Sequence, residues 1–306
     1  MGTAELAAVS LRALCRQPAL AVLAVVSQPD KPVGRKLQLQ PTPVKQAAFA
    51  ENLPVLQPAR ARDENFLTEL KQLTPDLIVV AAYGQILPTT ILDLPRHGCL
   101  NVHTSLLPKF RGASPIQSAL LHDERATGVT IMRMDIGLDT GPILTQRSTE
   151  ILDTDNAQTL HDRLAQLGAA LLVETIPDYV AGKILPRPQP REGVSHCGKI
   201  NKADGQLDWH LPARVLWNRQ RAFTPWPGAF THWQAKLLKI HHAHVASATG
   251  APGEILCADG DGLVIGCGTD ALVVTELQLE GGKRLTARQF LAGHPLAPGA
   301  RLGPAA

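Results

Sequence analysis

The chain has 306 residues, of which 44% are hydrophobic and 19% are charged, and its formal net charge is +3. This composition is typical of an ordinary soluble globule with one large or two modest domains. No apolar run approaches the length of a membrane span, and the segment from Met1 to Arg12 lacks the basic start of a secretory signal. The net charge is too small to indicate a partner by itself.

The five cysteines are scattered and form no Cys-x-x-Cys pair. An odd number of dispersed thiols favours a reducing, cytoplasmic compartment over a disulfide framework, and no structural zinc site is expected. Several histidines in the C-terminal part have no carboxylate partner nearby in the sequence. We therefore expect no metal.

The N-terminal part of the chain alternates apolar runs with helical patterns. Strands are expected at 20–26, 77–82, 99–103 and 129–134, and helices at 4–15, 42–51, 62–73 and 114–121. A further helix at 156–180 carries apolar residues with a period of 3.6. Near-continuous apolar strands between helices predict an α/β fold, with a doubly wound, mostly parallel sheet that is covered on both faces.

The pattern changes near residue 190. The stretch 186–191 reads Pro-Arg-Pro-Gln-Pro-Arg, which is typical of a linker. Beyond it, short apolar segments of period two are separated by Gly-rich turns, which predicts a small OB-like β-barrel. Thr286 and Gln289 predict a capping box for one last helix. We expect a catalytic domain at 1–188, a linker at 189–204 and a C-terminal domain at 205–306.

Three polar side chains are candidates for catalysis. Asn101 and His103 are two residues apart, and therefore share one face of a strand, while Asp139 lies in a turn between glycines. Because open α/β sheets bind ligands beyond the carboxyl ends of their strands, we expect these residues to meet in one crevice, beside Tyr83 and Gly84. An amide that holds an oxyanion, an imidazole that moves protons and a carboxylate that orients the imidazole suit acyl transfer. Each could instead be an ordinary polar residue of a strand end or turn.

The motifs around these residues resemble those of the tetrahydrofolate-dependent formyltransferases. Asn-Val-His-Thr-Ser-Leu-Leu-Pro at 101–108, Arg-Gly-Ala-Ser-Pro-Ile-Gln at 111–117 and Gly-Leu-Asp-Thr-Gly at 137–141 match the family's core. Gln-Pro-Asp-Lys-Pro-Val-Gly-Arg at 28–35 and Arg-Ala-Phe-Thr-Pro-Trp-Pro at 221–227 resemble the branch that acts on methionyl initiator tRNA. The resemblance covers essentially the whole chain.

This resemblance implies transfer of the formyl group of 10-formyltetrahydrofolate, the co-substrate, to the free amino group of methionyl initiator tRNA for translation initiation. Asn101 would hold the oxyanion, His103 would take or relay the amine proton, and Asp139 would fix the tautomer of His103. Thr104 is larger than the residue common in the family, but it points to the opposite strand face and should be tolerated. Residues expected beside the folate are Tyr83, Gly84, Ser105, Leu106, Leu107 and Pro108. We expect a bacterial-type cytoplasmic monomer without a membrane partner.

A basic loop is the candidate tRNA contact. The stretch 31–50 contains no acidic residue and is punctuated by prolines. Its cations are expected to bind phosphates of the acceptor stem, with Arg35 as the direct contact. These cations are Lys31, Arg35, Lys36 and Lys45. The alternative is a solvated charged face. In the C-terminal domain, which we expect to bind tRNA weakly, the exposed cations would be Lys236, Lys239, Lys283 and Arg284.

Three other functions remain open from the residues alone. The single Asp-Thr-Gly motif at 139–141 matches an aspartic protease, although that chemistry needs two such aspartates. A formyltransferase acting on a nucleotide-sugar amine, or a formyl-folate hydrolase, would share the core motif without needing the basic loop. A non-catalytic RNA-binding module would leave the polar trio without a role.

The start of the chain also differs from the family pattern. There the Met-Gly-Thr element follows the first strand, whereas here it stands at residues 1–3. We expect Met1 to be an internal methionine of a longer natural chain. The 20–26 strand should then lie beside an unfilled sheet position, and upstream extension should raise the melting temperature.

Overall fold

The computed structural model describes residues 1–33 and 38–303, and it divides the chain into two compact units. The first unit contains Met1–Pro115, Ala126–Glu150 and His161–Cys197, and the second contains Ile116–Arg125, Ile151–Leu160 and Gly198–Ala306. Two short segments that precede residue 161 thus belong to the unit that contains the C-terminal part of the chain. The domain boundaries and the linker expected at 189–204 stay a prediction. Among the described residues, no helix is both long and apolar enough to cross a membrane.

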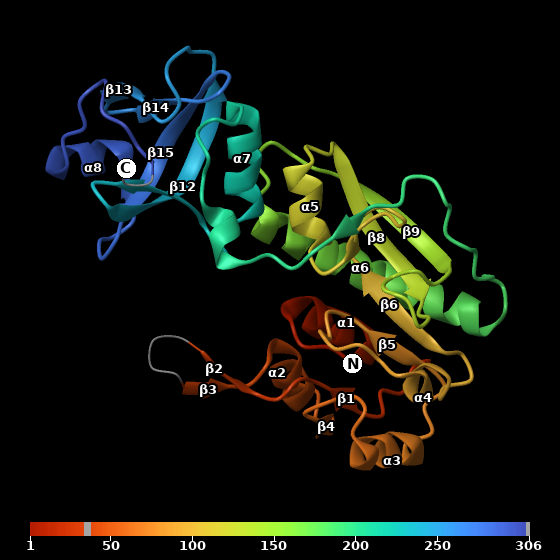
Figure 1. Ribbon diagram of the computed structural model, residues 1–306. Coiled ribbons are helices and arrows are strands. Elements are labelled where there is room, and N and C mark those ends of the chain that lie inside the picture. Colours follow the sequence, from red (N-terminus) through yellow and green to blue (C-terminus); the bar gives the residue numbers. More distant parts are fainter. Residues whose placement is uncertain (34–37, 304–306) are drawn as a thin grey trace. The chain divides into compact units, whose positions relative to one another are not determined.

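Helices and short strands follow one another through the first 197 residues of the chain (Figure 1). The helices are α1 (Glu5–Cys15), α2 (Pro43–Ala50), α3 (Glu64–Gln72), α4 (Thr89–Leu92), α5 (Pro115–Leu121) and α6 (Ala157–Val180). The shorter strands are β1 (Val25–Val26), β2 (Lys31–Val33), β3 (Gln38–Gln40), β4 (Val55–Leu56), β7 (Arg111–Gly112) and β10 (His196–Cys197). The α/β class expected from the sequence is confirmed.

The main sheet of the first unit is mixed in direction. Its order is β5 (Ile78–Val80), β6 (Cys99–His103), β8 (Ala126–Arg133) and β9 (Ile143–Glu150). β5 and β6 are parallel, whereas β8 runs antiparallel to both β6 and β9. β8 and β9 are joined by one turn, and a connection that short can join only antiparallel strands. A second parallel pair, β1 with β4, lies apart from this sheet.

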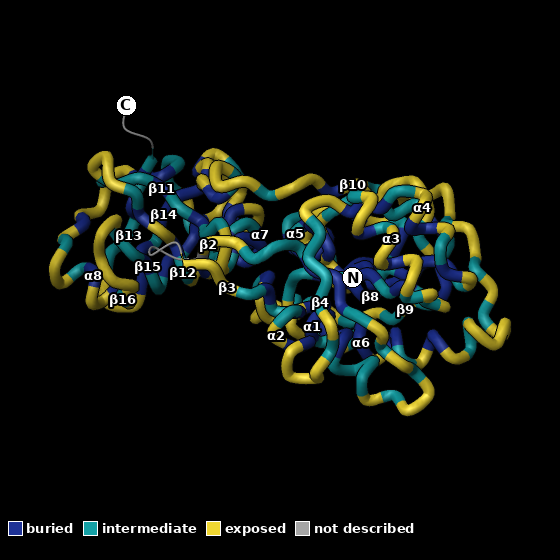
Figure 2. Tube along the Cα trace, turned by 90° about the horizontal axis from the view of Figure 1, so that it is seen from below, coloured by how far each residue is buried: buried dark blue, intermediate teal, exposed yellow. Residues whose placement is uncertain are grey.

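Helix α6 covers the face of β6 and β8 that lies opposite the polar trio. A Cβ atom at Gly168 would stand 2.9 Å from Val102 Cγ1 and 3.3 Å from Val129 Cγ1, so the helix backbone lies directly on both strands. Leu160, Leu164, Leu171 and Ile176 of the expected apolar stripe are buried. Figure 2 shows β8 and much of α6 in the colour of buried residues. The absence of a side chain at Gly168 therefore sets how closely α6 approaches β6.

Met1 and Gly2 lie between β1 and β5. The Met1 amino group donates to Val79 O at 2.6 Å, the Gly2 N–H donates to Val26 O at 2.8 Å, and Gly2 forms a parallel bridge with Ala81. Beside them is a cavity of about 530 Å³, lined largely by apolar residues of α1, 20–26 and 77–79.

The expectation of a strand over 20–26 is wrong for 20–24, since only Val25 and Val26 are in a strand. Residues 20–24 instead line the cavity, where no hydrogen-bonded strand neighbour is present in the described part of the chain. Burial lowers the pKa of the Met1 amino group to about 6. The location of the natural start stays a prediction.

The C-terminal unit is rich in antiparallel strands, as expected. Its sheet has the order β11 (Ala229–Trp233), β12 (Lys236–Ala246), β15 (Ala271–Leu279), β14 (Gly262–Gly266) and β13 (Ile255–Asp259), with β16 (Leu285–Thr286) on β15. Helices α7 (Ala213–Ala222) and α8 (Ala287–Gly293) contribute Leu216 and Phe290 to its core. The expected capping box is confirmed, because Thr286 and Gln289 exchange hydrogen bonds at the start of α8.

The close approach at Gly168 leads to the first prediction. Gly168→Val should lower the free energy of unfolding by about 1–3 kcal/mol, because its branched side chain overlaps Val102 and forces α6 away from β6. Denaturant titration measures this change. Ala170→Val, at an exposed position of the same helix, is the matched control and should have a much smaller effect. Equal destabilisation by the two variants would contradict the proposed close packing.

Candidate active site

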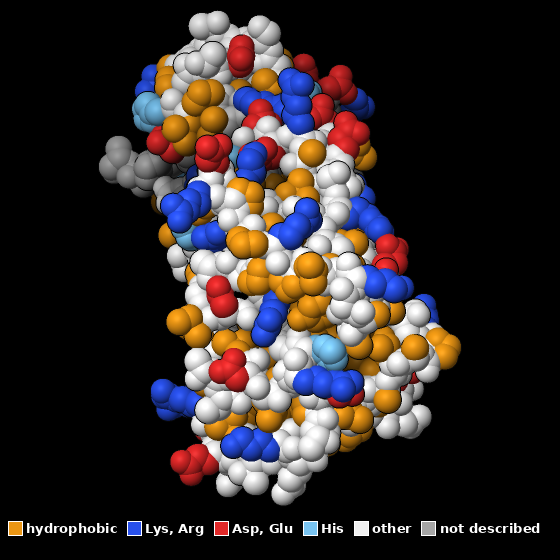
Figure 3. Space-filling model, turned by 90° about the vertical axis from the view of Figure 1, so that its right-hand side faces the viewer, with side chains coloured by type: hydrophobic (Ala, Val, Ile, Leu, Met, Phe, Trp, Pro, Cys, Tyr) orange, Lys and Arg blue, Asp and Glu red, His pale blue; other side chains and the backbone are white. Residues whose placement is uncertain are grey.

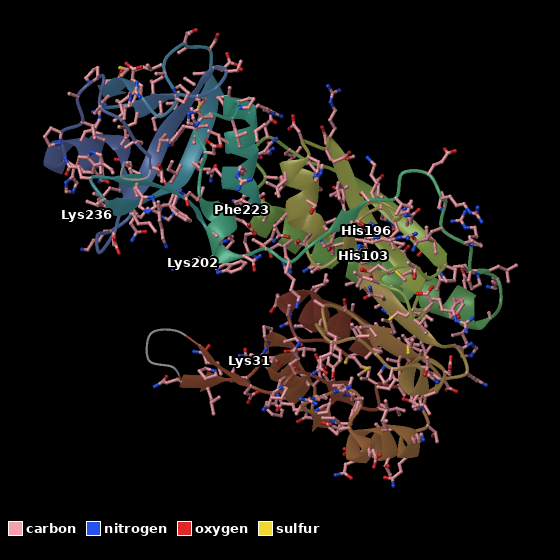
Figure 4. All side chains as sticks on the ribbon, viewed as in Figure 1. Lys31, His103, His196, Lys202, Phe223 and Lys236 are labelled. Atoms are coloured by element: carbon pink, nitrogen blue, oxygen red, sulfur yellow. The ribbon has the colours of Figure 1, made fainter. Side chains whose placement is uncertain are left out.

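Strand β6 places Asn101 and His103 on one face of the sheet, and Figure 4 marks His103. Residues two apart on a strand point to the same side, so the backbone alone brings the amide and the imidazole together. His103 is buried, with 5% of its surface exposed, and Asn101 is half-buried. The imidazole is thus shielded from bulk water, while the amide beside it remains partly accessible.

Asp139 completes the expected trio. Its Oδ1 accepts a hydrogen bond from Asn101 Nδ2 at 3.3 Å, and its Oδ2 accepts one from the Gly112 N–H at 2.9 Å. Oδ2 also lies 3.7 Å from His103 Nδ1, which is ion-pair range rather than a hydrogen bond. The structure therefore brings all three sequence-predicted residues together around one carboxylate.

The reason for this convergence differs from the expectation. β8 is antiparallel to β6, so its carboxyl end lies beside the amino end of β6. The turn after β8 therefore starts beside the amino end of β6, where the Met134 N–H donates to Cys99 O. This turn then folds back and brings Asp139 to Asn101. The expectation that the ends of parallel strands bring the three residues together is therefore wrong for Asp139. The turn between β8 and β9 places its carboxylate beside Asn101.

The second ring nitrogen of His103 faces a backbone carbonyl. Nε2 lies 3.0 Å from Phe110 O, and a carbonyl can only accept, so Nε2 carries the proton. In the neutral ring, Nδ1 is then the unprotonated nitrogen and faces the Asp139 side of the site. Phe110 has a φ of +58°, an uncommon backbone conformation for a residue other than glycine. The carbonyl of Phe110, rather than Asp139, selects the tautomer.

The segment expected beside the folate is tied to the sheet by its own hydrogen bonds. The Ser105 hydroxyl donates to Lys109 O, and Thr130 and Gln146 bond the backbone of Ser105 and Leu107. Ser105 and Leu107 are buried, whereas Leu106 and Pro108 are half-buried. Of this segment, Leu106 and Pro108 remain partly accessible to a ligand.

Tyr83 and Gly84 differ sharply in accessibility. Tyr83 packs in the apolar core, and burial raises the pKa of its phenol to about 12. Its hydroxyl has no hydrogen-bond partner in the described part of the chain, while its carbonyl accepts from Gln28 and Thr3. Gly84 is exposed and has a φ of +78°, which suits glycine. Thr104 is buried, on the face opposite His103.

The four cations of the basic loop have different surroundings. Lys31 is exposed on β2 and donates to Gln28 Oε1. Lys45 donates to Asp30 Oδ2 at 2.7 Å and to Gln57. The hydrogen bond from Lys45 lowers the pKa of the Asp30 carboxyl, and a hydrogen bond from Gln57 lowers it further. The charge of Lys45 is thus compensated within the fold. Arg35 and Lys36 lie outside the described residues.

Sequence reasoning missed the contribution of residues 187–197. Gln189 bonds both Arg111 and the Asp139 turn, and Ser195 bonds the backbone of Phe110 and Arg111. Proline-rich composition predicted a linker for much of this segment, and no periodic signal marks an irregular segment that packs against a site. Within residues 1–33 and 38–303, no group of three or more His, Cys, Asp or Glu side chains is arranged to hold a metal ion.

Comparison with known proteins identifies the class. Residues 2–176 match the formyl transferase family, and residues 199–295 match its C-terminal domain family. The fold resembles that of an N-formyltransferase from Helicobacter canadensis, solved with folinic acid and dTDP-3-aminofucose. The TM-score is 0.67 at 19% identity, and the match covers 89% of this chain and 96% of that one. The chain is a formyltransferase.

Closer relatives identify the particular family. The chain is 48% identical to the methionyl-tRNA formyltransferase of Citrifermentans bemidjiense over 99% of its own length and 95% of the relative's. It is also 48% identical to that of Myxococcus xanthus, over 98% and 96% of the two lengths. The chain belongs to the methionyl-tRNA formyltransferase family. The alternatives of an aspartic protease and of a non-catalytic RNA-binding module are therefore wrong.

The geometry predicts the effect of removing the amide. Asn101→Ala should lower kcat by about 100- to 1,000-fold, because it removes the amide that we expect to hold the oxyanion and one donor to Asp139. Formyl transfer at saturating substrates measures this, and a circular dichroism spectrum checks that the variant is folded. Asn65→Ala, on the exposed surface of α3, should be fully active. Near-normal turnover in Asn101→Ala would remove this residue from the mechanism.

Proposed function

We propose that Asn101, His103 and Asp139 catalyse transfer of the formyl group of 10-formyltetrahydrofolate to the free amino group of methionyl initiator tRNA. Membership of the methionyl-tRNA formyltransferase family assigns this reaction and this co-substrate to the chain, and makes translation initiation its role. The observation that supports the assignment to these residues is a single carboxylate that binds Asn101 and lies beside the unprotonated nitrogen of His103.

Asn101 is suited to hold the oxyanion. The amine attacks the formyl carbon, so negative charge develops on the formyl oxygen. A side-chain amide has two N–H donors, and the carboxylate of Asp139 engages one of them. The second is available to the oxygen of the tetrahedral intermediate. Because Asp139 fixes the amide in advance, little reorganisation is needed when the charge appears.

His103 is suited to move the proton. The attacking amine loses one proton as the carbon–nitrogen bond forms, and Nδ1 of His103 is the lone pair that can accept it. The imidazolium that results lies 3.7 Å from Asp139 Oδ2, which stabilises its charge. When the bond between the formyl carbon and the folate nitrogen breaks, the same proton passes to that nitrogen. The cycle ends with a neutral imidazole, and protons balance.

The loops beside the trio offer apolar contacts for the co-substrate. Ile136 and Leu138 stand in the Asp139 turn with 81% and 62% of their surfaces exposed. With Leu106 and Pro108 they would pack against the rings of the folate. Ser105, Leu107 and Tyr83 would support this surface from within, and Gly84 would let the ligand approach the backbone.

The tRNA contact is assigned to the hairpin of β2 and β3, whose described side chains are exposed. Lys31, Arg35 and Lys36 would bind phosphates, whereas Lys45 would hold the base of the hairpin through Asp30. On the face drawn in Figure 3, basic side chains are interspersed with acidic ones, so individual cations carry this proposal.

In the C-terminal unit, the exposed Lys236, Lys239 and Lys283 are candidates for weak tRNA binding. Arg284 is paired with Glu276 and is a weaker candidate. We further propose a cytoplasmic monomer, with a catalytic domain at 1–188 and a tRNA-binding domain at 205–306.

Formylation of methionyl initiator tRNA by the purified chain tests the function. Transfer should require both the formyl-folate and the charged tRNA, with no transfer to a nucleotide-sugar amine. His103→Ala should lower kcat by about 100- to 10,000-fold, with partial rescue by added imidazole, because the base is removed. His210→Ala, at an exposed position, is the control. Formate release at the normal rate without tRNA would instead indicate a hydrolase.

The basic hairpin predicts a defect specific to tRNA. The double variant Lys31→Ala/Arg35→Ala should raise the apparent KM for charged tRNA. It should also make the salt dependence of binding shallower, by about 0.9 in the logarithmic slope for each phosphate that is no longer neutralised. Affinity for the formyl-folate should not change. Lys71→Ala, an exposed lysine of α3, is the matched control. An equal fall in folate affinity would show that the hairpin supports the co-substrate pocket.

A further inference from the structure

Residues 187–197, here called the strap, run along the candidate active site. At one end, Arg187 and Ile143 exchange backbone hydrogen bonds at 2.7 and 2.8 Å. At the other end, β10 pairs in parallel with β7, and the Ala113 N–H donates to Cys197 O. The strap thus joins the strand that follows the Asp139 turn to the strand that contains Gly112. A Cβ atom at Gly112 would stand 2.2 Å from Cys197 O, so only glycine allows this approach.

Between these ends, the side chain of Gln189 bonds to both sides of the site. Its Nε2 donates to Asp139 O and to Gly141 O, both at 2.8 Å. Its Oε1 accepts from Arg111 Nε at 3.0 Å and from the same guanidinium's terminal nitrogen at 2.7 Å. Arginine can only donate and backbone carbonyls can only accept, so the orientation of the amide is determined. Both N–H donors and both acceptor positions of the amide are in use.

These bonds reach two of the groups that orient the Asp139 carboxylate; the third, Asn101, donates to it directly. The first is the backbone of Asp139 itself, which has a φ of +53° and therefore needs outside contacts to hold it. The second is the Gly112 N–H, which donates to Oδ2 and belongs to the residue after Arg111. Gln189 is bonded to the carbonyl of Asp139 and to the side chain of Arg111, the residue before Gly112. Its amide therefore fixes the distance between the turn and β7.

We propose that Gln189 is a positioning residue for the formyl-transfer reaction. It holds the Asp139 turn against β7, so that the carboxylate stays within reach of Asn101 and His103 as charge develops. This inference rests on the proposed role of Asp139. Misplacement of a reacting group by about 1 Å can cost about 100-fold in rate, so a side chain that touches no substrate can still control kcat.

Two variants separate the bonds of Gln189. Gln189→Met keeps the length of the side chain and removes all of its hydrogen bonds. Gln189→Glu keeps an acceptor for Arg111 but cannot donate to the carbonyls of Asp139 and Gly141. Both should lower kcat about 10- to 100-fold and leave the KM for formyl-folate and for charged tRNA essentially unchanged. Arg187→Ala is the matched control, since exposed Arg187 joins the strap through its backbone.

A second readout reports on the turn directly. The amide resonance of Gly112 in a heteronuclear NMR spectrum depends on the hydrogen bond to Asp139. It should shift in both Gln189 variants and stay in place in Arg187→Ala. Normal kcat, or an unmoved Gly112 resonance, in folded Gln189 variants would overturn the inference. Failure of both variants to fold would make Gln189 a structural residue and would overturn it as well.

The reference variant Asp139→Asn separates this inference from the proposed function. If Asp139→Asn retains normal turnover, the role proposed for Asp139 fails, and the inference about Gln189 fails with it. If Asp139→Asn is inactive while both Gln189 variants turn over normally, the proposed function stands and only the positioning role is overturned.

Discussion

The carboxylate of Asp139 is the interaction on which the site depends. A carboxylate at a partly buried position needs hydrogen-bond donors to offset its lost hydration. Here the donors are the side chain of Asn101 and the backbone N–H of Gly112, which come from different strands. The same carboxylate lies 3.7 Å from Nδ1 of His103. The Asp139 carboxylate thus specifies how two strands and one turn meet, and the geometry that we propose for formyl transfer depends on its hydrogen bonds.

The scaffold behind this carboxylate is rigid for identifiable reasons. Gly168 lets α6 lie directly on Val102, the residue between Asn101 and His103. The loop after β6 turns back at Phe110, whose positive φ aims its carbonyl at the imidazole, and Ser195 of the strap holds that loop. Close packing on one face and hydrogen bonds on the other leave the side chains of Asn101 and His103 little freedom. Such preorganisation favours charge stabilisation in the transition state.

The division of labour along the chain follows from its charges. Within the catalytic fold, Lys45 is paired with Asp30, so its charge stabilises local structure. The neighbouring Lys31 remains exposed and bonds only a neutral glutamine in the described structure. A mild net charge of +3 agrees with the proposal that a few placed cations, rather than the charge of the whole chain, contact the tRNA. The β-rich C-terminal unit adds three more exposed lysines at 236, 239 and 283.

The sequence by itself determined whatever local periodicity encodes. The two-residue spacing of Asn101 and His103, the stripe of α6 and the capping box at Thr286 are all confirmed, because each depends on neighbours in the chain. Family motifs supplied the reaction. Only the tertiary structure decided the antiparallel direction of β8 and the lack of a strand at 20–24, since an apolar run does not state which strand will pair with it. The tertiary structure also decided three contacts between residues that are not adjacent in the sequence. These are the carbonyl that sets the tautomer of His103, the ion pair of Lys45 and the bond from Gln189 to Asp139, 50 residues away. These features depend on where distant backbone atoms lie, and that is set by packing of the whole unit.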